Sequence, residues 1–149
     1  MDSEIEAAVR DLAAMGFKGH DVYLAELIPV VEMAWADGQI EPDERALLES
    51  YCAALTDRLN RAAGAPFFRL GHTLRVLDRL TQRRLSPAQR MVSVYALKAW
   101  CGTGPGGAQR RREMLAWASA VAAVDGDTEW DSRELFWLNT MTKTLGGGL

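Results

Sequence analysis

Cysteine and histidine are scarce in this chain of 149 residues. There are two of each, and Cys52, Cys101, His20 and His72 stand far apart, without paired spacing. A disulfide framework or a structural zinc site needs several such residues at short intervals. The scarcity therefore argues against both, and it predicts free, buried thiols in a cytosolic protein.

Long apolar runs are also missing. The longest stretch of low polarity, residues 116–124, is far shorter than the roughly 20 apolar residues of a membrane-spanning helix. The N-terminus is acidic and lacks the basic start and apolar core of a signal peptide. We therefore expect a cytoplasmic protein without a membrane span.

The sequence contains none of the common catalytic motifs. It has no GxSxG turn and no P-loop, and neither cysteine has a histidine close by in the chain. The net charge of −3 argues against general nucleic-acid binding. We expect a protein that is not an enzyme, binds no nucleic acid and carries no organic cofactor.

Helical periodicity dominates what is present. Alanine, leucine and arginine are abundant, and apolar residues recur at helical spacing almost throughout. Pro42 and the sequence Ser86-Pro87-Ala88-Gln89 are typical helix starts, and Asp21 is a plausible N-cap. Pro29 is expected to kink or split its helix. These signals predict an all-α single domain, 1–149, with seven helices: 3–15, 21–37, 42–62, 66–83, 86–101, 108–124 and 131–145.

Charge is distributed in three blocks. Residues 1–57 hold 13 acidic and 3 basic residues, a net charge of −10. Residues 58–112 hold 1 acidic and 12 basic residues, a net charge of +11, and residues 113–149 have a net charge of −4 from 6 acidic and 2 basic residues. The acidic ends are therefore expected to lie near one another or to fold onto the basic middle.

A short internal repeat divides the chain into two halves. Residues 36–48 align without gaps on 124–136, sharing an Asp-Gly pair, a Glu, an Asp, an Arg and an apolar pair. Each copy follows an alanine-rich apolar helix and precedes an amphipathic one. We therefore predict pseudo-symmetric halves at about 21–62 and 108–145, joined by connecting helices at about 66–101.

The repeated aspartates, Asp37 and Asp125, each follow a helix C-terminus, where the helix dipole disfavours a carboxylate. Two interpretations remain open. The carboxylates cap the next helix, or they bind a hard cation such as calcium or magnesium together with carbonyl oxygens. An EF-hand is excluded, because Trp130 and Phe136 occupy positions that require Gly and Glu.

The sequence Ala-Trp-Ala-Asp-Gly at 34–38, followed by Ile40 and Glu44, resembles the TerB-like domain of tellurite-resistance proteins. The turn at 125–126 resembles that family's second copy, although Ser132 stands where its glutamate is expected. The resemblance implies an all-helical, non-enzymatic module of a bacterial stress-response assembly near the membrane. It also implies acidic metal ligands, which in this chain are Asp37, Glu44, Asp125, Asp127 and Glu129.

A row of arginines gives the alternative function. Arg69, Arg75, Arg79 and Arg83, with His72, fall on the helix face opposite Phe67, Leu70 and Leu74. Together with Arg84, Arg90 and 110–112 they form either an ordinary solvated face or a basic surface for an acidic protein, phosphate or anionic lipid. The two functional hypotheses are therefore a cation-binding or scaffolding module, and a pure protein-interaction module.

Overall fold

The structure is a computed structural model that describes residues 3–36, 38–101 and 105–123. Within these ranges the chain is all-helical, with six α-helices, one 3-10 helix and no strand. The seventh predicted helix, 131–145, lies outside the described residues. No helix of the described part is both long and apolar enough to cross a membrane. The elements are α1 (Ser3–Ala14), η1 (Gly19–Glu26), α2 (Leu27–Trp35), α3 (Pro42–Ala63), α4 (Leu70–Gln82), α5 (Pro87–Cys101) and α6 (Pro105–Ala123).

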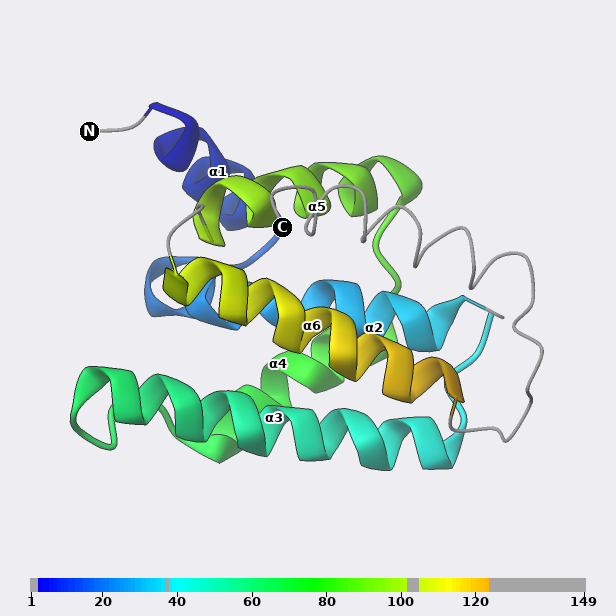
Figure 1. Cartoon of the computed structure of the whole chain (residues 1–149). Helices are drawn as coiled ribbons and strands as arrows, with labels where there is room; N and C mark the ends of the chain where they lie inside the picture. Colours follow the sequence, from blue (N-terminus) through cyan, green and yellow to red (C-terminus); the bar gives the residue numbers. More distant parts are fainter. Residues whose placement is uncertain (1–2, 37, 102–104, 124–149) are drawn as a thin grey trace.

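The helices pack as three stacked pairs (Figure 1). Helix α1 packs on α5, α2 packs on α6, and α3 packs on α4. The α2–α6 pair forms the middle layer, and α2 also contacts α3, α4 and α5. Residues 27–34 of α2 are all buried, so this helix forms the centre of the core.

Local signals determine both ends of α3 and the start of α5, as predicted. Pro42 opens α3, and Gly64 closes it in the left-handed conformation, with φ of 72°. At the start of α5, the backbone N–H of Gln89 donates to Ser86 Oγ over 3.1 Å. The Ser86 N–H donates to Gln89 Oε1 over 2.9 Å, which completes the predicted capping box.

The segment before α2 differs from the prediction of one helix over 21–37. Residues 19–26 form the 3-10 helix η1, and α2 begins only at Leu27. Asp21 does not act as an N-cap, because it lies inside η1 and its Oδ1 contacts His72 Nε2 at 2.6 Å. Pro29 lies in the first turn of α2, where its missing N–H removes no helical hydrogen bond.

Helix α4 begins at Leu70, four residues later than predicted. The Asn60 side chain prevents an earlier start, because it binds the Phe68 backbone on both sides, accepting from N–H over 2.7 Å and donating to C=O over 2.9 Å. The predicted apolar face is only partly correct, since Phe67 and Leu70 are exposed, whereas Leu74 is partly buried against the core. The buried residues of α4 are Thr73, Val76, Leu77 and Leu80. Helix α6 begins at Pro105, three residues before its predicted start at residue 108.

Candidate functional site

Two glutamates are buried at the ends of the most apolar segment of the protein. Glu26 precedes α2 and is 0% exposed, and Glu32 lies within α2 and is 3% exposed. An ionised carboxylate is costly to remove from water unless a cation and hydrogen bonds compensate it. Both glutamates therefore depend on partners from elsewhere in the chain.

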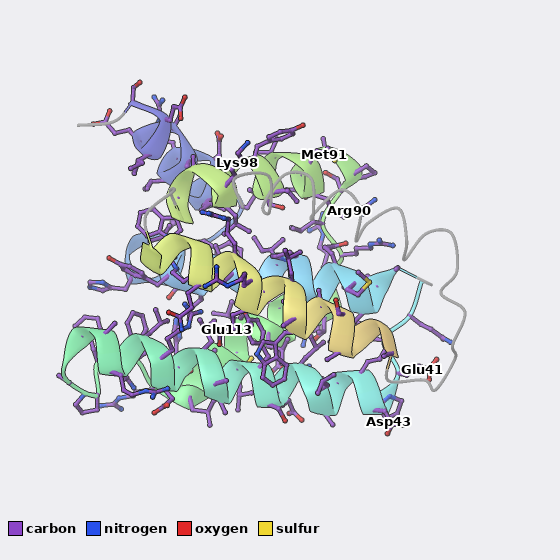
Figure 2. All side chains as sticks on the ribbon, viewed as in Figure 1. Glu41, Asp43, Arg90, Met91, Lys98 and Glu113 are labelled. Atoms are coloured by element: carbon purple, nitrogen blue, oxygen red, sulfur yellow. The ribbon has the colours of Figure 1, made fainter. Side chains whose placement is uncertain are left out.

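Arginines of α3 and α6 hold Glu26. Arg58 Nη2 donates to Glu26 Oε1 over 2.7 Å, and Arg110 donates to Oε2 from Nη2 over 3.1 Å and from Nε over 3.2 Å. Arg58 Nε also lies 3.2 Å from Oε2 of Glu113, which extends between α6 and α3 (Figure 2). Burial opposes the charge of Arg58, but Glu26 and Glu113 outweigh it, so the pKa of Arg58 is raised.

Arginines from the α4–α5 region hold Glu32. Arg84 Nε donates to Glu32 Oε2 over 3.1 Å, and Arg90 Nε lies 3.7 Å from the same oxygen. Arg90 lies in the first turn of α5, on the side towards α2 (Figure 2). Burial raises the pKa of Glu32, and the two arginines offset only part of this rise.

These contacts fold the basic middle of the chain onto its acidic start, as the charge blocks predicted. They also correct one prediction, because Arg84, Arg90 and Arg110 are not a simple extension of the solvated arginine face. Two guanidinium groups hold each buried carboxylate. Such an arrangement fastens α2 at its start and near its middle, and it fixes the positions of the arginines.

Of the five predicted metal ligands, the structure describes only Glu44. Its Oε1 accepts the Glu41 N–H over 2.9 Å in a capping box in which Glu41, rather than Asp37, is the N-cap of α3. Within the described ranges, no three His, Cys, Asp or Glu side chains gather as a metal site. The other four predicted ligands lie outside the described residues: Asp37, Asp125, Asp127 and Glu129.

The four arginines of the predicted docking face are all exposed. We call Arg69, Arg75, Arg79 and Arg83 the arginine surface. Arg79 is also used inside the fold, because its Nη2 donates to the Gly16 carbonyl over 3.3 Å and its guanidinium lies 5.2 Å from the Phe17 ring centroid. The other three form no ion pair with a described residue.

No protein-family model, curated protein or solved structure matches this chain. Its function must therefore be inferred from its own residues.

The buried glutamates are the residues that the sequence reasoning missed. Two signals point to them in retrospect. Glu26 and Glu32 are the charges in an otherwise apolar stretch, and the +11 block that follows provides more arginines than an exposed surface requires. Neither signal identifies which arginine pairs with which glutamate, because the partners are 32 to 84 residues apart.

Proposed function

We propose that this chain is a non-enzymatic protein-interaction module that docks an acidic partner through the arginine surface. The observation that supports the proposal is the exposure of Arg75 within α4 and of Arg69 and Arg83 at the two residues that flank this helix, without ion pairs to described residues. Carboxylates that lie near other arginines, such as Glu26 and Glu32, are already paired inside the fold. The positive charge of the arginine surface therefore remains available to a partner.

The rigidity of α4 strengthens this proposal. Thr73 is hydrogen-bonded to Thr56 of α3 over 2.8 Å, and Arg45 of α3 forms an ion pair with Asp78. With the Asn60 clamp on the Phe68 backbone, these contacts fix both ends of the helix against α3. A surface that is already ordered loses less conformational entropy when a partner binds.

Charge reversal tests this docking surface. We expect the Arg69→Glu/Arg75→Glu variant to bind fluorescently labelled poly-glutamate about tenfold more weakly than the wild type at low salt, since each exposed charge contributes up to about 1 kcal/mol. Anisotropy titrations measure the affinity. Wild-type binding should also weaken as added salt screens the charges.

The matched control is Arg61→Glu/Arg112→Glu, which makes the same charge change at exposed arginines of α3 and α6. It should keep nearly wild-type affinity. Equal losses in both double variants would show that net charge alone governs binding and would contradict a docking role for α4.

The resemblance to the TerB-like domain is part of the same proposal. We infer a bacterial TerB-like module of a stress-related assembly, located in the cytoplasm, with related halves at about 21–62 and 108–145. Support comes from α2 and α6, the helices that precede the two copies of the Asp-Gly sequence, because they pack on each other in the middle layer. A pseudo-symmetric bundle would place its two central helices in this way.

Cation binding is the second proposal. It is favoured by three carboxylates within the four residues that open α3, namely Glu41, Asp43 and Glu44. Figure 2 shows Glu41 and Asp43 at the turn between α2 and α3. Because Glu41 and Glu44 already cap the helix, these described residues do not form a complete site. The proposal therefore requires Asp37, with Asp125, Asp127 and Glu129 for a second site.

A thermal-unfolding titration tests the cation proposal. Chelator-treated protein should gain about 2.7 kcal/mol of stability when free calcium or magnesium reaches a hundredfold excess over its Kd. Asp37→Asn or Asp125→Asn should abolish the gain, whereas Asp57→Asn, at an exposed acid of α3, should not. The absence of a stability gain with either metal would contradict the proposal.

A further inference from the structure

A pocket of about 330 Å³ lies where the end of α4 and the start of α5 meet the end of α1. Three of its lining residues are arginines: Arg79, Arg83 and Arg84. No acidic side chain is among the described residues that line it. Its size is at the lower end for small-molecule sites, so it suits a compact ligand.

Two of the three guanidinium groups are held in place by the fold. Arg79 is fixed by the Gly16 carbonyl and the Phe17 ring. Arg84 is fixed through its Nε by the buried Glu32, and its Nη nitrogens take no part in that hydrogen bond. Arginine presents its N–H groups in a planar fork that matches the oxygens of phosphate, so fixed arginines provide a pre-organised anion site.

The charge around the pocket favours a dianion over a monoanion. Among the described residues, Glu32 carries the one carboxylate that forms an ion pair with a lining arginine, and it also lies 3.7 Å from Nε of Arg90, which does not line the pocket. At least two positive charges therefore remain uncompensated by these contacts. A phosphate monoester carries about −1.5 to −2 charges at pH 7, whereas a simple carboxylate carries one.

The rest of the lining adds apolar and amide contacts. Met15, Leu80 and Leu85 provide apolar walls, and Gln89 lies in the first turn of α5. Such a mixture is typical of pockets that bind an anionic group together with a small apolar body. We infer that this pocket binds a small molecule that carries a phosphate monoester, with Arg79, Arg83 and Arg84 as the phosphate-binding residues.

This inference does not depend on an acidic protein partner, and two variants separate the two proposals. Arg84 lines the pocket but is not part of the arginine surface, whereas Arg75 belongs to that surface but does not line the pocket. Substitution of Arg75 should weaken poly-glutamate binding, and substitution of Arg84 should weaken phosphate binding.

Isothermal titration with inorganic phosphate at constant ionic strength tests the pocket. We expect Arg84→Gln and Arg83→Gln each to raise the Kd for phosphate about tenfold, because each removes charge-assisted hydrogen bonds. Arg75→Gln is the matched control and should change the Kd less than about twofold. Arg83→Gln keeps the test valid if loss of the Arg84–Glu32 pair disturbs folding, since Arg83 is exposed and has no ion pair to a described residue.

Acetate, which carries one negative charge, tests whether the pocket requires a dianion. If the pocket selects a dianion, acetate should bind at least about tenfold more weakly than phosphate under the same conditions. The inference is overturned if phosphate does not bind, if acetate binds equally well, or if Arg75→Gln weakens binding as much as the two pocket variants do.

Discussion

Replacing Arg58 with alanine should lower the free energy of unfolding by about 3–5 kcal/mol, because it leaves a buried carboxylate without one of its cations. Glu26 is 0% exposed and loses its shortest ion-pair contact, at 2.7 Å. Glu113 loses its pair with Arg58 in the same substitution. Since a domain is commonly stable by only 5–15 kcal/mol, this is a large fraction of the total.

Urea denaturation followed by circular dichroism measures the effect. Arg61→Ala is the matched control, because Arg61 lies on the same helix and pairs only on the surface with Asp57. It should cost less than about 1 kcal/mol. If Arg58→Ala and Arg61→Ala shift the urea midpoint equally, the buried pair does not hold α2 in the way that we describe.

The native protein should protect Cys52 from thiol reagents. The pKa of the Cys52 thiol is raised to about 12, chiefly by burial; Arg45 opposes this rise, and Glu49 and Asp78 add to it. The reactive thiolate is therefore about a thousandfold less populated than in an ordinary cysteine near neutral pH. The side chain is also fully buried, so a reagent reaches it only when the structure opens.

Labelling with a disulfide reagent at pH 8 measures this protection. In a Cys101→Ser background, which leaves Cys52 as the one thiol, the native protein should react at least about a thousandfold more slowly than the urea-unfolded chain. The Cys52→Ser/Cys101→Ser variant gives the background rate. Rapid labelling of the native protein would show that Cys52 is accessible, contrary to its position in the core.

The sequence predicted those helices whose ends depend on local chemistry. The capping box of Ser86 and Gln89, the proline that opens α3 and the left-handed Gly64 that closes it act within a few residues. Their effects on helix starts and stops hold in any surroundings. For this reason α3 and α5 lie within a residue or so of their predicted positions.

Elements whose ends depend on contacts outside the helix itself were predicted less well. The start of α4 depends on Asn60, which binds the Phe68 backbone eight residues along the chain. Residues 19–26 adopt a 3-10 helix that buries Val22, Leu24 and Ala25, although helix propensity favoured a continuous α-helix. A side-chain hydrogen-bond pair decides the first case, and burial in the core overrides propensity in the second.

The candidate site also combines features that local sequence predicts with features that only the packed structure shows. Periodicity was sufficient to place Arg75 on an exposed face of α4, and Arg69 is exposed as well, although it precedes the helix. It was not sufficient to show that Arg84 and Arg110 pair with buried glutamates, because those pairs form across 52 and 84 residues. Composition reveals an excess of arginine, but only the packed structure shows which arginines are used inside the fold.

The long separation within the Glu26 cluster has a consequence for synthesis on the ribosome. At 5–20 residues per second, the 84 residues between Glu26 and Arg110 take about 4 to 17 seconds to translate. Until Arg110 has been added, Glu26 lacks one of its two cations, and α2 lacks its middle-layer neighbour α6. The nascent chain therefore passes through an interval in which its most apolar helix is made but cannot be buried in its final surroundings.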